Sequence, residues 1–245
     1  MNVNIPHIES FGISDIGVSR TNNEDVFAEL PEEHFYLLAD GMGGHLAGEV
    51  AAKEAVLHMC DSIERFLRTN PLPTPLIAQN HLQQSFSEAN NWIRSLAYQH
   101  ADFAGMGTTL CCIWILGKEL LYGHIGDSRI YRYRNQKIEL LTKDHSLRQK
   151  ILSLGYRDVL TRALGISAVA EPDIQKTTFL PGDLYLLSSD GLHGALSDRQ
   201  IESILRNHPS LKEAAIELVE AAKKAGSTDN ITILMLKNEK DLSRQ

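Results

Sequence analysis

The chain has 245 residues, 43% of them hydrophobic, and its 24 Lys and Arg against 31 Asp and Glu give a formal net charge of −7. That length and apolar content suffice for one large core, so we expect a single domain over residues 1–245 with a polar tail from about residue 238. The negative charge argues against nucleic-acid and anionic-membrane partners, because both require a broad basic surface.

The first residues lack the basic and apolar segments of an export signal, and the longest apolar run, residues 110–116, is too short to span a membrane. The three cysteines, Cys60, Cys111 and Cys112, cannot all pair internally, and neighbouring residues of a strand point to opposite faces. We therefore expect a cytoplasmic protein with reduced thiols and no membrane span.

Hydrophobic patterning predicts the secondary structure in chain order. Two amphipathic helices, over residues 52–67 and 82–96, follow the first strands, and Ser197 and Ser210 are placed to cap two later helices. Short connections between neighbouring strands are typical of antiparallel pairing, so the elements predict an α+β sandwich with helices outside its sheets. Ten segments have strand character: 8–16, 25–30, 34–39, 108–116, 119–126, 128–134, 137–141, 175–179, 183–189 and 231–237.

Acidic side chains recur next to the strand ends of this pattern. Strands place such side chains rigidly, and several anions held close together repel by several kcal/mol unless protons or cations neutralise them. The pattern therefore predicts a site for hard divalent metal ions. Six carboxylates share this placement: Glu24, Asp25, Asp40, Asp127, Asp190 and Asp229.

Simpler interpretations exist for single members of this set. Asp40 and Asp190 each precede a glycine, as turn residues often do. Asp127 is near enough in sequence to pair with Arg129 or with backbone amides. The ten histidines show no close zinc-binding spacing, so we do not predict a zinc site.

Eight short motifs, taken together, resemble one known family. In order and spacing they are similar to the PPM family, also called PP2C, of metal-dependent protein serine/threonine phosphatases, most closely its bacterial stand-alone catalytic domains, over about residues 8 to 237. The motifs are SDIGVSRTNNED at 14–25, LADGMGGH at 38–45, GTT at 107–109, GDSR at 126–129, LTKDHS at 141–146, LTRALG at 160–165, SDGL at 189–192 and DNIT at 229–232.

The resemblance implies a four-layer αββα sandwich, in which two central antiparallel sheets are flanked by helix pairs, with a binuclear Mn²⁺ or Mg²⁺ centre at one end. By the family pattern, Asp40 bridges two ions, Glu24 and the carbonyl of Gly41 hold one, and Asp190 and Asp229 hold the other. Asp127 with Asp190 is implied to hold a third, weaker ion. Oxygen-only ligands select hard ions of this kind.

The same resemblance implies an activity. A water activated by two metal ions would attack phosphorus and hydrolyse phosphoserine or phosphothreonine in proteins, opposing a serine/threonine kinase. Arg20 is implied to clamp the phosphate, for which its planar fork is suited, and Asp25 to orient a metal-bound water. We expect phosphorylated proteins and a kinase system as partners, and a monomeric chain.

Two departures from the family pattern affect these expectations. Met42 stands where eukaryotic members carry a histidine that is a candidate general acid, so protonation of the leaving group is left to water, His45 or His193. Only residues 147–159 lie where bacterial relatives usually carry a longer flap beside the active site, which predicts a more open site.

Two alternative functions follow from these departures. A binding or scaffold domain without turnover would be expected to lack a bridging carboxylate, and none is missing. Hydrolysis of small phosphorylated metabolites fits an open site. Cysteine-dependent phosphatase chemistry is disfavoured, because no cysteine is followed by five residues and then an arginine.

Overall fold

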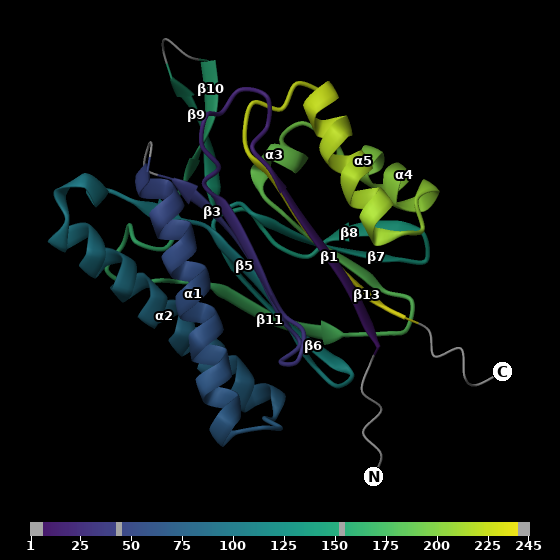
Figure 1. Ribbon diagram of the computed structural model, residues 1–245, viewed down its shortest axis with the longest axis horizontal. Helices are drawn as coiled ribbons and strands as arrows, with labels where there is room; N and C mark the ends of the chain where they lie inside the picture. Colours follow the sequence, from purple (N-terminus) through teal and green to yellow (C-terminus); the bar gives the residue numbers. More distant parts are fainter. Residues whose placement is uncertain (1–6, 43–45, 152–154, 240–245) are drawn as a thin grey trace.

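The computed structural model describes residues 7–42, 46–151 and 155–239. Two antiparallel sheets lie between outer layers of helices, which confirms the predicted four-layer α+β sandwich (Figure 1). The first sheet has the order β11-β6-β5-β3-β2 and the second the order β1-β13-β12-β7-β8.

The strands of the first sheet are β2 (Asp25–Leu30), β3 (Phe35–Met42), β5 (Leu110–Leu116), β6 (Glu119–Ile125) and β11 (Asp173–Thr178), with β4 (Gly107–Thr108) paired to β3. Those of the second sheet are β1 (Ile8–Asp15), β7 (Arg129–Arg134), β8 (Lys137–Leu140), β12 (Leu184–Ser188) and β13 (Ile231–Asn238). A separate hairpin consists of β9 (Ser146–Ile151) and β10 (Gly155–Leu160) and projects from one end of the sandwich (Figure 1).

Helices α1 (Leu46–Thr69) and α2 (Pro75–Gln99) cover the first sheet, and α4 (Asp198–Asn207) and α5 (Leu211–Lys224) cover the second (Figure 1). Ser197 and Ser210 are the N-cap residues of α4 and α5, as predicted. A 3-10 turn, η1 (Ala101–Phe103), follows α2, and a single helical turn, α3 (Asp190–His193), follows β12. Among the helices of the described residues, none combines the length and hydropathy needed to cross a bilayer.

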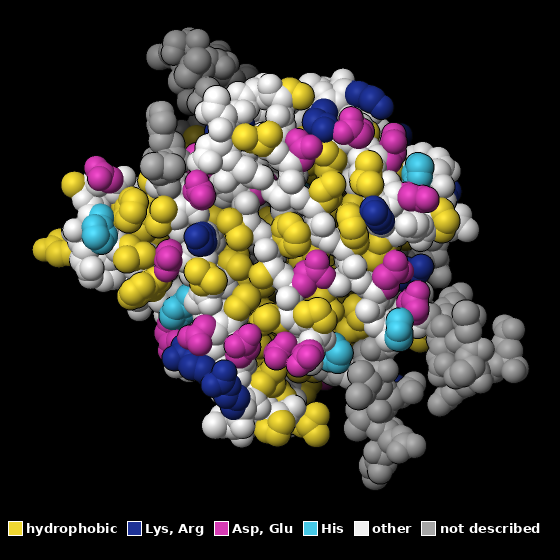
Figure 2. Space-filling view, in the orientation of Figure 1, with side chains coloured by type: hydrophobic (Ala, Val, Ile, Leu, Met, Phe, Trp, Pro, Cys, Tyr) yellow, Lys and Arg dark blue, Asp and Glu magenta, His cyan; other side chains and the backbone are white. Residues whose placement is uncertain are grey.

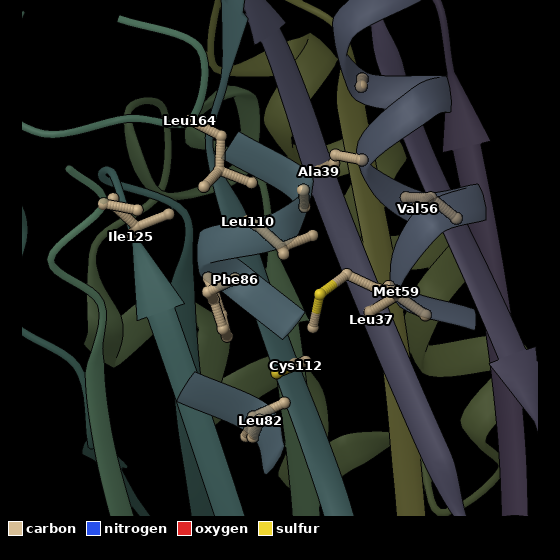
Figure 3. Close-up of a cluster of buried hydrophobic side chains, with 14 of the residues drawn as sticks. Leu37, Ala39, Val56, Met59, Leu82, Phe86, Leu110, Cys112, Ile125 and Leu164 are labelled. Atoms are coloured by element: carbon tan, nitrogen blue, oxygen red, sulfur yellow. The ribbon is translucent and has the colours of Figure 1, made fainter. Parts of the chain in front are cut away.

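Buried side chains form three layers of core. One lies between α1, α2 and the first sheet, where Met59 and Phe86 pack near Leu37 (Figure 3), a second lies between the sheets, and the third lies under α4 and α5. The neighbours Cys111 and Cys112 belong to different layers, because alternate residues of β5 face opposite sides. All three cysteines are free, as predicted.

Local differences from the predicted elements lie near the strand ends. Strand β3 continues to Met42, and the predicted strand 108–116 is interrupted at Thr109. The short flap segment pairs with itself as β9 and β10, a hairpin that the sequence pattern did not predict. On the face shown in Figure 2, acidic and basic side chains are interspersed with hydrophobic ones.

Candidate active site

The six carboxylates come from both sheets and meet at one end of the sandwich. Asp25 and Asp40 are directly opposite each other in the pairing of β2 with β3. Asp190 begins α3 shortly after the end of β12, and Asp229 lies shortly before β13. Both of these strands belong to the second sheet. The Ser189 hydroxyl donates a buried hydrogen bond of 2.7 Å to Asp25 Oδ2 and thereby joins the two sheets at this end.

The electrostatics of this cluster show how closely its members interact. Burial, followed by the charges of Asp25, Asp190, Asp127 and Asp229, raises the pKa of Asp40 well above its usual range. Burial and then Asp229, Asp127 and Asp25 raise the pKa of Asp190 to about 7. These carboxylates therefore cannot all be ionised at neutral pH without a compensating positive charge.

Several hydrogen bonds hold the Asp25 carboxylate. Burial raises its pKa to about 6, against the lowering effect of hydrogen bonds from Ser189 and Thr232. Its side chain also shares a hydrogen bond with Asp40. Asp25 is thus held next to the centre of the cluster.

Glu24 is the last residue before β2 and is 8% exposed, whereas the residues before it in the same loop are half-buried or exposed. Its backbone carbonyl accepts a hydrogen bond of 3.0 Å from the Gly41 N–H. A Cβ on Gly48 would collide with Glu24 Oε2, and a Cβ on Gly41 would collide with the Gly48 carbonyl. Both glycines are therefore needed for the start of α1 to lie against Glu24 and the end of β3.

Arg20 is a cationic side chain that the structure places against this cluster. Its Nη2 lies 2.6 Å from Asp229 Oδ2. Burial acts to lower the pKa of Arg20, but the charges of Asp229, Glu24 and Asp190 raise it above its ordinary value. Its side chain is 47% exposed, so part of the guanidinium is open to a ligand from solvent.

The residues present fit divalent metal ions. Every predicted side-chain ligand is a carboxylate, and hard ions such as Mg²⁺ and Mn²⁺ prefer oxygen. Asp190 Oδ1 is buried and has no hydrogen-bond partner. An acceptor left in this way is costly unless a cation completes it. Burial beside other carboxylates, without a compensating cation, also raises the pKa values of Asp40 and Asp190.

Hydroxyl side chains that sequence reasoning did not single out support the cluster. Thr109 Oγ1 accepts a hydrogen bond of 3.0 Å from the Asp40 N–H and lies 2.7 Å from Ser128 Oγ. Ser189 holds Asp25 in the way described above. Thr109, Ser128 and Ser189 all lie within the eight family motifs. That position is the only sequence signal for their supporting roles, because the roles depend on contacts between distant segments.

Arg129, a predicted alternative partner of Asp127, pairs instead with Asp144. Its Nε and Nη2 lie 2.9 and 2.7 Å from the two oxygens of Asp144. The negative charge of Asp127 acts on Asp40 and Asp190. Asp127 therefore belongs to the cluster.

The histidine candidates for leaving-group protonation do not gain support. Burial, with a further contribution from Arg129, lowers the pKa of His193 to about 3. Its Nδ1 lies 3.1 Å from the Ser188 hydroxyl. The His193 ring is therefore neutral at neutral pH and is not in the acidic imidazolium form that a general acid needs, and His45 lies outside the described residues.

A second group of ligand-type side chains consists of His124, His145 and Asp173, whose ligand atoms lie within 4.8 Å of one another. The Gly126 N–H donates to His145 Nδ1, at 3.2 Å, so the ring proton of a neutral His145 is on Nε2, which faces Asp173 Oδ2 at 3.2 Å. That nitrogen has no lone pair for a metal ion. We therefore interpret this group as a hydrogen-bond network.

Carboxylates gathered in this way suit divalent ions of the kind that activate water in metal-dependent hydrolases. The family model for protein phosphatase 2C matches residues 18–234, and the chain belongs to this family. It is 33% identical over 246 residues to the serine/threonine phosphatase stp of Listeria monocytogenes, covering 95% of this chain and 96% of that protein. It is 32% identical over 248 residues to the protein phosphatase PhpP of Streptococcus pneumoniae, covering 94% and 97%.

Solved structures of serine/threonine phosphatases are also similar to this chain. The serine/threonine phosphatase PstP/Ppp of Mycobacterium tuberculosis matches with a TM-score of 0.83 and 33% identity, covering 95% of this chain and 99% of that one. A structure of the PstP catalytic domain in complex with two manganese ions matches with a TM-score of 0.81 and 32% identity, covering 95% and 99%.

Proposed function

We propose that this protein removes phosphate from phosphoserine and phosphothreonine side chains of proteins by metal-dependent hydrolysis. The observation that carries the proposal is the convergence of carboxylates from both sheets on one another, with an arginine beside them. Such a cluster is stable in its ionised form only with bound cations. Membership of the protein phosphatase 2C family supports the same reaction.

Two Mn²⁺ or Mg²⁺ ions fit the ligands present. Asp40 would be shared between them, Glu24 and the Gly41 carbonyl would serve one, and Asp190 and Asp229 the other. Asp127 with Asp190 would hold a third, weaker ion. Bound ions of this type would supply Lewis acidity and would lower the pKa of a water for attack on phosphorus. Ser189 and Thr109 keep the carboxylate-bearing segments in place.

Arg20 and Asp25 act on the substrate and the attacking water. The Arg20 fork retains donors beyond the one that faces Asp229, and these suit the oxygens of a phosphate monoester. Asp25 lies beside Asp40 within the cluster and orients the water by accepting its hydrogen bond. Since the His193 ring is neutral at neutral pH, we assign protonation of the leaving alkoxide to solvent.

The cellular setting belongs to the same proposal. Residues 1–245 act as one catalytic domain, a monomer in the cytoplasm that counteracts a serine/threonine kinase. The ions used there are Mn²⁺ or Mg²⁺. Its substrates are phosphorylated proteins.

The test is release of phosphate from a phosphothreonine peptide by the purified protein in the presence of Mn²⁺ or Mg²⁺, with chelated protein as the control. We expect turnover only with metal. A protein that binds neither ion and releases no phosphate would overturn the proposal in favour of a binding or scaffold role. Higher kcat/KM on small phosphorylated metabolites than on phosphopeptides would assign it to metabolite hydrolysis.

A further inference from the structure

Asn230 lies next to Asp229 and is 3% exposed. Its side-chain amide joins three backbone groups of a distant segment. Asn230 Oδ1 accepts from the Glu24 N–H at 2.9 Å, while Nδ2 donates to the carbonyls of Ile16 and Asn22, both at 3.0 Å. The Asn230 N–H donates to Asp229 Oδ1 at 2.8 Å. Both amide hydrogens and the amide oxygen are therefore used.

These three backbone groups enclose one loop. Residues 16–24 connect β1 to β2, and they include Arg20 and end with Glu24. Gly17 adopts a φ of +76°, and a Cβ there would collide with the Asp229 carbonyl, so the loop backbone lies directly against the residue before Asn230. A single amide thus binds the start of the loop at Ile16, its far side at Asn22 and its end at Glu24.

We infer that Asn230 is a positioning residue that fixes the loop of Arg20 and Glu24 against Asp229. The expected effect of Asn230 on phosphate and metal rests on the proposed function, because Asn230 acts only through Arg20, Glu24 and Asp229. No other common side chain offers one acceptor and two donors in the same planar arrangement, apart from the longer Gln. An aspartate of the same shape has no donor for the two carbonyls.

The fold supplies a matched control. Asn230 directly precedes β13, and Asn238 is the last residue of that strand. Asn238 is 4% exposed and donates through Nδ2 to the Phe179 carbonyl at 3.3 Å. Asn230→Ala and Asn238→Ala remove the same buried amide from opposite ends of β13. We expect Asn230→Ala to raise KM and to lower kcat/KM for a phosphothreonine peptide with Mn²⁺ by about 100-fold, since a small displacement of positioning groups has that effect. Asn238→Ala should stay within about twofold of the unaltered protein.

A double-variant comparison tests whether Asn230 acts through Arg20. If it does, Asn230→Ala should change KM by no more than about twofold when Arg20→Ala is already present. Effects on KM that multiply would overturn the inference, as would a kcat/KM for Asn230→Ala within about twofold of that for Asn238→Ala. Asn230→Asp keeps the shape and the acceptor, and it must reproduce the increase in KM. All variants are measured below their unfolding transitions.

Amide hydrogen exchange separates this inference from the proposed function. Backbone amides of residues 17–24 should exchange faster in Asn230→Ala than in Asn238→Ala, whether or not the protein hydrolyses any phosphate ester. Equal exchange in the two variants would show that Asn230 does not hold the loop. Inactive but normally protected wild-type protein would instead count against the phosphatase proposal alone.

Discussion

Arg20 Nη2 lies 2.6 Å from Asp229 Oδ2, although 209 positions separate the two residues in the chain. The contact joins the proposed phosphate clamp to a proposed metal ligand. A divalent ion on Asp229 would compete with the guanidinium for the same oxygen charge. Under the proposed function, metal binding and the freedom of Arg20 to reach a phosphate would therefore be coupled through this ion pair.

Arg20→Ala should chiefly raise KM for phosphopeptides, because it removes charge-assisted hydrogen bonds to the phosphate. Such bonds contribute about 1.5–3 kcal/mol, which corresponds to a change of about 10- to 150-fold. Steady-state kinetics with saturating Mn²⁺ measure it, and Arg65→Ala, which removes an exposed arginine paired with Asp61, is the control. An unchanged KM would argue against the clamp.

Asp40→Asn should lower turnover by several orders of magnitude while the fold is retained. In metal-free protein the raised pKa of Asp40 means that folding must protonate this carboxyl at neutral pH. A neutral Asn avoids that cost, so the unfolding temperature should rise, by about 2–4 °C for each kcal/mol gained. Thermal unfolding with chelator and with Mn²⁺ measures both the rise and the loss of metal stabilisation. The control is Asp61→Asn, which changes an exposed carboxylate of α1 and should alter neither turnover nor the unfolding temperature. Near-normal turnover would remove Asp40 from the site.

The stability of the metal-free protein should fall as pH rises from about 4 to about 7. The pKa values of Asp25, about 6, and of Asp190, about 7, lie above the ordinary value of 3.8, so the folded state binds more protons than the unfolded state in this window. The free energy of unfolding then decreases with pH. Thermal unfolding of chelated protein across this range tests it, and Asp190→Asn should show a smaller decrease. A stability that increases with pH there would contradict the raised pKa values.

His193→Gln should leave the shape of the pH–rate profile unchanged. The pKa of His193 is about 3, so its ring is neutral at every pH at which the enzyme would be assayed. A glutamine can still pair with the Ser188 hydroxyl, which keeps the packing intact. Measuring kcat against pH for both proteins is sufficient. Loss of the alkaline limb in the variant would identify His193 as the general acid after all.

A chelator should abolish turnover, whereas thiol alkylation should leave it unchanged. Burial raises the pKa of Cys60 to about 11 and that of Cys112 to about 12, and it raises that of Cys111 well above its ordinary value. None of the three is a thiolate at neutral pH, so none is nucleophilic. Phosphate release after EDTA or iodoacetamide treatment distinguishes the two. Inactivation by iodoacetamide without unfolding would bring a cysteine into the mechanism.

Much of the architecture was predictable because it is written in local patterns. The continuous apolar runs of β5 and β12 and the serines that cap α4 and α5 are local signals, and the structure agrees with them. The hairpin of β9 and β10 was not predictable, because its exposed Leu147 and Val159 give no alternation between a buried and a solvent face. Nor was α3, a single turn whose helical state depends on its position at the end of β12.

The residues that could carry the chemistry can be identified without a fold, because a carboxylate at a strand end and an arginine shortly before Glu24 are visible in the order of residues alone. How these residues act on one another depends on their arrangement in space. The pKa of Asp190, the pairing of Arg20 with Asp229 and the three hydrogen bonds of Asn230 all arise between segments far apart in the chain. Electrostatic and hydrogen-bond energies depend on distance in space, and a single sequence does not record that distance.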